Sequence, residues 1–149
     1  MTRIAIYGAG AIGGYMGALL SDTTAEVTLI ARGPHLAAIR EKGLTLEMGG
    51  ESTTRTIAAT DNPAEAGEQD FVIIALKAHS VPGVVDAMQP LLGKQTALVT
   101  AVNGVPWWYF HGLEGPWRDR RLESVDPGGR QWAGIGPDRA IGCGTGPTT

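Results

Sequence analysis

Apolar runs of strand length alternate with amphipathic segments of helix length from residue 3 to about residue 104. Such runs, rich in Val and Ile with little polar alternation, are typical of strands buried on both faces of a parallel sheet. The pattern therefore predicts an α/β fold with a doubly wound, mostly parallel sheet covered by helices on both faces. The predicted strands are Arg3–Tyr7, Glu26–Ile30, Asp70–Leu76 and Thr96–Val102.

Proline and glycine mark where the helices begin and end. Pro34 suits a first helical turn, and Gly43 suits the left-handed position that follows a last turn. Pro63 gives the same start signal after Asp61 and Asn62, either of which can cap a short helix. The sequence thus predicts one helix from Pro34 to Gly43 and a shorter one after Pro63.

Other segments give weaker signals. Ser80–Leu92 is amphipathic and predicts a third helix, whereas Leu44–Met48 and Thr53–Ala58 flank two glycines and predict a β-hairpin. After about residue 111 glycine and proline interrupt any period, so loops and short strands are expected, with Arg139–Cys143 as the last strand. The domain is predicted over residues 1–143, followed by an irregular or disordered tail at 144–149.

A GxGxxG motif follows the first strand and opens a helix that runs to about Leu20. In this context Gly8 permits the tight turn, Gly10 leaves room for a pyrophosphate, and Gly13 lets the helix pack closely on the strand. The helix N-terminus offers free N–H groups to phosphate. The motif predicts a Rossmann-type dinucleotide site; the alternative is a glycine turn that serves only packing. The motif residues predicted to bind the cofactor are Gly8, Gly10, Ala11, Ile12 and Gly13.

Arg32 stands just past the second strand, where NAD-binding folds carry an acid for the ribose 2′-hydroxyl. A guanidinium there can form paired bonds to a 2′-phosphate, so the sequence favours NADP over NAD. An exposed charge at the start of a loop is the simpler alternative.

Lys77 and Asn103 each follow a predicted strand, at the edge where open α/β sheets bind ligands. Lys77 can bond ribose or phosphate oxygens, and Asn103 can offer an amide to the nicotinamide ribose or to a substrate. A solvated strand end and an Asn-Gly turn explain them equally well. His79 and His111 have no partner that the sequence identifies, and His35 is predicted on a helix surface.

Twelve basic against fifteen acidic residues give a net charge of −3, which disfavours nucleic-acid binding. No run approaches the roughly 20 apolar residues of a membrane span. Cys143 is the single cysteine, so neither a disulfide framework nor a cysteine metal site is expected, and a cytoplasmic location is favoured.

The aromatic run Trp107–Phe110 is either anchored in a core or exposed to a partner, which allows a homodimer.

Taken together, these motifs resemble the N-terminal half of the ketopantoate reductase (2-dehydropantoate 2-reductase) family. The resemblance implies NADPH-dependent reduction of a 2-keto acid, ketopantoate, to pantoate for pantothenate biosynthesis. It also implies that Arg32 and Lys77 hold the cofactor and that Asn103 lies at the cofactor and substrate cleft. The matching segments are 8–14, 31–33, 42–44, 76–78, 103–104, 124–129 and 135–143.

In that family the general acid is a lysine of a second, helical domain, and no lysine follows Lys94 here. We therefore expect the helical domain to be absent, the chain to be truncated or frameshifted, and no catalytic residue to lie in it. The alternative function is a catalytically inactive NADP-binding or sensor module.

Overall fold

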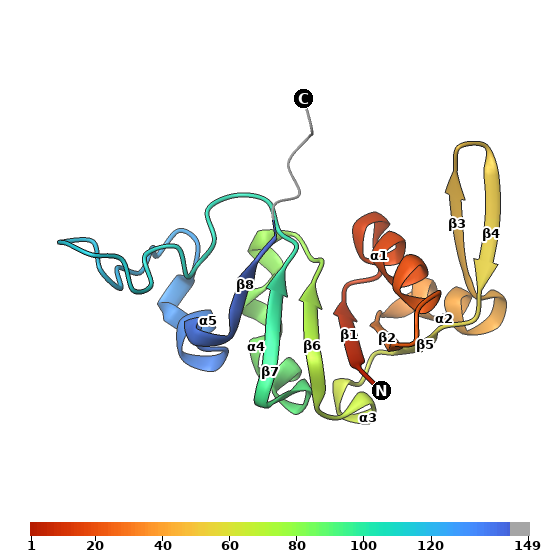
Figure 1. The fold of residues 1–149 in the computed structure, drawn as a ribbon, viewed down its shortest axis with the longest axis horizontal. Helices are drawn as coiled ribbons and strands as arrows, with labels where there is room; N and C mark the ends of the chain where they lie inside the picture. Colours follow the sequence, from red (N-terminus) through yellow and green to blue (C-terminus); the bar gives the residue numbers. More distant parts are fainter. Residues whose placement is uncertain (144–149) are drawn as a thin grey trace.

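The structure is a computed structural model that describes residues 1–143; the tail expected at 144–149 lies outside the described residues. Its main sheet has six strands in the order β5-β2-β1-β6-β7-β8, and every neighbouring pair is parallel (Figure 1). The predicted doubly wound α/β fold is confirmed. The strands are β1 (Arg3–Tyr7), β2 (Glu26–Ile30), β5 (Ala58–Thr60), β6 (Gln69–Ile74), β7 (Leu92–Thr100) and β8 (Ala140–Gly142).

Five α-helices and several 3₁₀ turns connect the strands. Helix α2 begins and ends as predicted, with Pro34 in its first turn and Gly43 at φ 80° after its last. The prediction of one helix over Ser80–Leu92 is wrong. Pro82, Gly83 and Pro90 break that segment into 3₁₀ turns around the single turn α4. The helices are α1 (Ala11–Ser21), α2 (Gly33–Lys42), α3 (Pro63–Ala66), α4 (Val85–Met88) and α5 (Arg130–Gly134).

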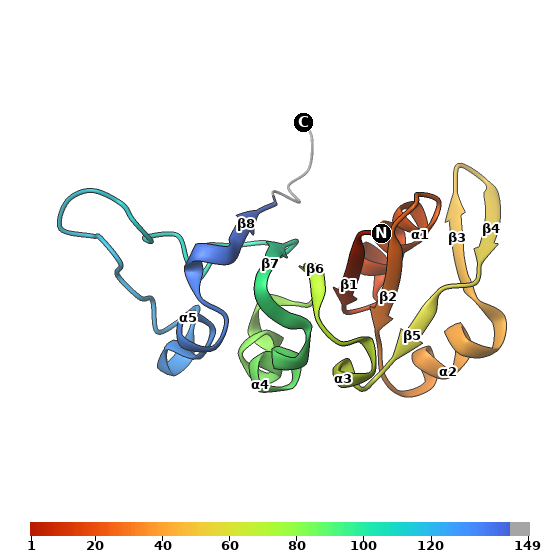
Figure 2. The same cartoon turned by 60° about the horizontal axis from the view of Figure 1, so that its bottom comes forward.

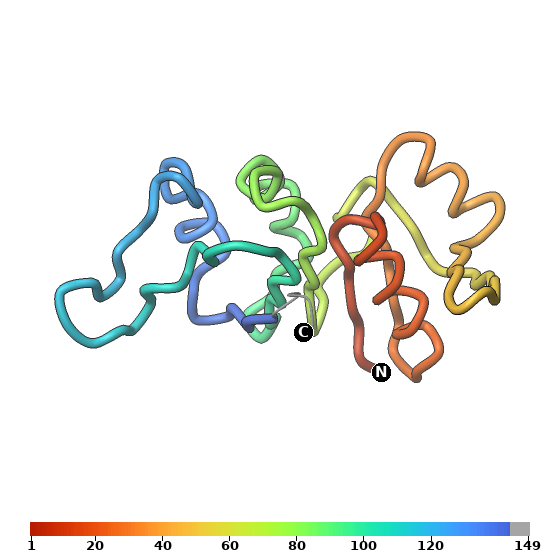
Figure 3. Tube along the Cα trace, turned by 90° about the horizontal axis from the view of Figure 1, so that it is seen from above, coloured from red at the N-terminus to blue at the C-terminus, as the bar shows by residue number. Residues whose placement is uncertain are grey.

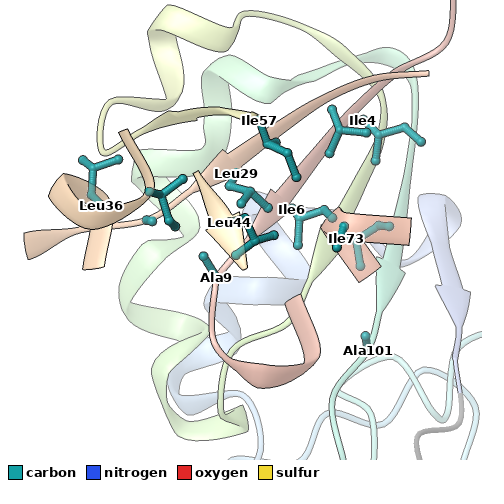
Figure 4. Packing of buried hydrophobic residues seen from close by; sticks show 13 residues of the cluster. Ile4, Ile6, Ala9, Leu29, Leu36, Leu44, Ile57, Ile73 and Ala101 are labelled. Carbon is teal, nitrogen blue, oxygen red and sulfur yellow. The ribbon is translucent and has the colours of Figure 1, made fainter. Parts of the chain in front are cut away.

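Alternate residues of β1, β2, β6 and β7 enter two separate cores. On β1, Ile4 and Ile6 face one core, and Ala5 and Tyr7 face the other. The first core holds residues of α1, α2 and β3 (Figure 4). The second holds residues of α3 and α4. Burial on both faces explains why the strands read as continuous apolar runs.

The predicted hairpin is present as β3 (Leu44–Met48) and β4 (Glu51–Arg55), which form a sheet of their own. Gly49 at φ 61° and Gly50 at φ 83° supply the turn. The second strand ends earlier than expected because Ile57 turns into the core and the next residues join β2 as β5. Figure 1 and Figure 2 show the hairpin beyond the β5 edge of the sheet, away from β6 and β7.

The chain after β7 extends away from the sheet before it returns to α5 and β8 (Figure 1 and Figure 3). Trp107 is anchored in the second core, as one of the two expectations for the aromatic run has it, whereas Tyr109 is 54% exposed. Helix α5 was not predicted. It forms because the buried Asp126 carboxylate accepts the backbone N–H groups of Gln131 and Trp132 at 2.8 and 2.9 Å.

Candidate nucleotide-binding site

The glycine motif forms a tight turn between β1 and α1. Gly8 has φ 104°, a conformation that disfavours any side chain. Its N–H donates to the carbonyl oxygen of Ile30 at 3.0 Å, which joins the turn to the end of β2. A Cβ atom on Gly13 would lie 1.8 Å from the carbonyl oxygen of Gly8, so helix and strand can approach this closely only with glycine there. Both glycines therefore act in building the turn.

Gly10 differs from its neighbours, because a Cβ atom added there meets no atom within 4 Å. Packing gives no reason for glycine at this position, whereas a ligand lying against the backbone does. Gly10 is the N-cap of α1, and no side chain caps that helix. Ala11 and Ile12 form its exposed first turn. The N-terminus of α1 is therefore open to an anion.

A cleft of about 630 Å³ lies beside the turn, within the range of small-molecule sites. The glycine turn borders it, as do Arg32 after β2 and Lys77 after β6. Neither basic side chain has a hydrogen-bond or salt-bridge partner among residues 1–143. Two basic side chains without a salt-bridge partner thus line the same cleft as Gly10, the N-cap of α1.

Tyr7, Ile30 and Asp61 also line the cleft. Burial raises the pKa of the Tyr7 hydroxyl above its ordinary value, and the positive charge of Arg32 opposes that rise. Arg32 therefore acts electrostatically on Tyr7 inside the cleft while remaining exposed itself. Tyr7 keeps its proton at neutral pH.

The structure brings four of the predicted residues together on the cleft wall, namely Gly8, Gly10, Arg32 and Lys77. Asn103 lies apart from them. It borders a separate pocket of about 30 Å³ at the ends of β6 and β7, together with Trp107 and other mainly apolar residues. Since β6 and β7 are neighbours in the sheet, this pocket and the cleft open from the same edge.

Sequence reasoning missed two histidine contacts. His35, predicted only on a helix surface, lines the cleft, and its Nε2 lies 2.6 Å from the carbonyl oxygen of Ala9. His111 lies between Asp119 and Asp138, with ring nitrogens 3.2 and 3.1 Å from their carboxylates. No spacing in the sequence signals either contact.

Within residues 1–143 no cluster of His, Cys, Asp and Glu has the arrangement of a metal site. No helix in the same part of the chain is long and apolar enough to cross a membrane.

A parallel sheet with an open glycine turn at its carboxyl edge defines a Rossmann-like domain, the fold in which many oxidoreductases bind dinucleotides. The family model of ketopantoate reductase PanE/ApbA matches residues 4–106. The chain belongs to this family of oxidoreductases.

Individual relatives agree with the family match. The chain is 50% identical over 141 residues to a 2-dehydropantoate 2-reductase from Mesorhizobium japonicum, covering 94% of this chain and 43% of that one. Identity to the enzyme of that name from Pyrococcus horikoshii is 33%, over 69% of this chain and 33% of the other. A crystal structure assigned to a ketopantoate reductase from Ralstonia solanacearum superposes with TM-score 0.90 at 43% identity, covering 96% of this chain and 44% of that one. The chain thus spans less than half the length of these relatives.

Proposed function

We propose that the chain binds NADP(H) in the cleft beside the glycine turn. The observation that carries the proposal is the unpaired Arg32 guanidinium on the same cleft wall as the open position at Gly10. The Arg32 guanidinium suits a 2′-phosphate, and the open position at Gly10 suits a pyrophosphate. An NAD site would carry an acid where Arg32 stands.

Each predicted residue has a distinct part in this proposal. The turn at Gly8 and Gly13 holds the backbone close, while Gly10 and the first turn of α1, with Ala11 and Ile12, face the pyrophosphate. The remaining two are side chains at strand ends: Lys77 bonds ribose or phosphate oxygens, and Asn103 reaches the nicotinamide ribose or the substrate.

The reaction that fits the family is the reduction of ketopantoate, a 2-keto acid, to pantoate on the route to pantothenate. NADPH supplies the hydride when it is bound, and a general acid must supply a proton to the carbonyl oxygen. The residues of this chain would bind and orient the cofactor at the sheet edge that also carries Asn103. We place this chemistry in the cytoplasm and allow a homodimer.

Two measurements on the purified chain test the proposal. A fluorescence titration should show saturable NADPH binding, and absence of binding would refute the proposed site. NADPH oxidation with ketopantoate then separates two functions: turnover supports a reductase, whereas binding without turnover supports an NADP-binding or sensor module.

A further inference from the structure

The hydrogen bond between His35 and Ala9 joins two parts of the cleft that are separated in sequence. Ala9 belongs to the glycine turn, and His35 lies in the first turn of α2, three residues after Arg32. A carbonyl oxygen only accepts hydrogen bonds, so the Nε2 atom of His35 carries the proton and donates it. The Nε2 to oxygen distance is 2.6 Å, which is short for an N–H···O bond.

The segment that carries Arg32 is held to the glycine turn at both of its ends. Before Arg32, the carbonyl oxygen of Ile30 accepts the N–H of Gly8 at 3.0 Å. After Arg32, His35 donates to Ala9. The Arg32 side chain itself has no hydrogen-bond or salt-bridge partner in the described part of the chain, so its distance from the turn is set through the segment that carries it, by these two bonds together with the packing of Ala31 and Leu36 in the core.

Both ends of the His35 bond rest on the packed core. Ala9 is 6% exposed and belongs to the same buried cluster as Leu36, the residue after His35 (Figure 4). The bond therefore joins two rigid parts of the molecule, because packed interiors deform little.

We propose that His35 is a positioning residue that sets the distance between the glycine turn and Arg32. It would thereby favour a dinucleotide with a phosphate at each of these places over one that lacks the 2′-phosphate. This inference rests on the proposed function, which assigns the pyrophosphate to the turn and the 2′-phosphate to Arg32. The physical reason is preorganisation: without the bond, each binding event must also order the exposed stretch 32–35, which lies between the buried Ala31 and Leu36.

The test compares three ligands on four proteins: the unmodified chain, His35→Ala, His35→Gln and His79→Ala. Glutamine keeps an N–H donor at about the reach of Nε2. His79 is exposed and does not line the cleft, which makes it a matched control. The ligands are NADPH, NADH and adenosine 2′-monophosphate, and dissociation constants are measured by calorimetry.

We expect His35→Ala to reduce the preference for NADPH over NADH by about twofold to tenfold, the value of one neutral hydrogen bond. His35→Gln should restore most of it, and His79→Ala should leave it unchanged. Adenosine 2′-monophosphate reaches Arg32 without spanning to the glycine turn, so its affinity should not change in any variant.

Three results would overturn the inference. An unchanged preference in His35→Ala means that the bond sets no distance. An equal loss for NADPH and NADH means a purely structural role. A loss for adenosine 2′-monophosphate as large as that for NADPH means that His35 contacts the phosphate directly.

A measurement without ligand keeps the inference separate from the proposed function. Amide hydrogen exchange at Gly8, whose N–H bonds Ile30, should quicken in His35→Ala and not in His79→Ala. Failure of the unmodified chain to bind NADPH refutes the proposed function. Unchanged hydrogen exchange at Gly8 in His35→Ala refutes the inference that His35 holds the glycine turn to the segment that carries Arg32.

Discussion

Replacement of Arg32 by alanine tests the choice between NADP and NAD most directly. The Arg32 side chain caps no backbone group, and its backbone at φ −142° and ψ 163° is extended, which alanine adopts freely. The substitution therefore removes a charge from the cleft without disturbing α2. We expect NADPH affinity to fall while NADH affinity stays nearly constant.

The magnitude follows from the setting of the guanidinium. A hydrogen bond to a charged group contributes about 1.5–3 kcal/mol. Arg32 is exposed, so solvent and salt screen the interaction and the lower value applies. That value corresponds to a loss of about tenfold in the ratio of the two affinities. Arg32→Lys should lose less, because it keeps the charge but not the paired geometry.

Isothermal titration of both cofactors at low and moderate salt measures this ratio. Lys42→Ala is the matched control, since it removes a positive charge at the far end of the ten-residue helix α2. That end lies about 15 Å away, beyond the Debye length of about 10 Å at 0.1 M salt. Equal affinities of the unmodified chain for NADPH and NADH would refute the reasoning.

Four further substitutions test the turn and the fold. Gly10→Val should abolish NADPH binding with an unchanged circular dichroism spectrum, because a Cβ atom at Gly10 meets no protein atom within 4 Å and would block the proposed pyrophosphate position, whereas Gly13→Ala should lower the melting temperature through its clash with the turn. The hydrogen bond from Arg55 lowers the pKa of Asp22, so this carboxylate stabilises the fold above its unfolded pKa of about 3.9 and loses the effect as pH falls through the lower folded value. Asp22→Asn should therefore flatten the acid side of a plot of melting temperature against pH, and an unchanged slope there would contradict this. Asp126→Ala should cost about 1–3 kcal/mol in urea unfolding, because it leaves buried N–H groups unpaired, and an unchanged midpoint would argue against that role.

The sheet could be predicted because its signals are local. The strand at Arg3–Tyr7 has the same bounds in the structure, since its residues are buried on both faces and read as one apolar run. Helix α5 could not be predicted, because Asp126, which accepts the N–H groups of its first turn, stands before a Pro-Gly-Gly run that by itself indicates a loop. The hydrophobic period over Ser80–Leu92 wrongly predicted one continuous helix. The prolines within that segment interrupt the helix despite the period.

The residues of the candidate site also fall into those that local sequence signals locate and those that they do not. The glycine turn, Arg32 and Lys77 could be located because each directly follows a strand, and strand ends of a parallel sheet share one edge. His35 could not, because its partner is a backbone carbonyl 26 residues away, which no pattern of side chains reveals. Residues that line the cleft at strand ends follow from topology, whereas a contact such as that of His35 follows only from three-dimensional packing.

Topology also explains why the cleft lies beside β1. The chain passes from β1 to β2 on one side, while β6 and β7 continue on the other, so the connections after β1 and β6 diverge and leave a crevice between them. The segment after β2 brings Arg32 and His35 to this crevice, and the inserted hairpin lies beyond the β5 edge (Figure 1). Under the proposed function, selection of the 2′-phosphate depends on the short segment 30–35, which the core anchors at both ends. The reaction would instead depend on how the nicotinamide ribose and the substrate are placed at Asn103, which lies at the same edge of the sheet. Cofactor choice and turnover are therefore separable by mutation.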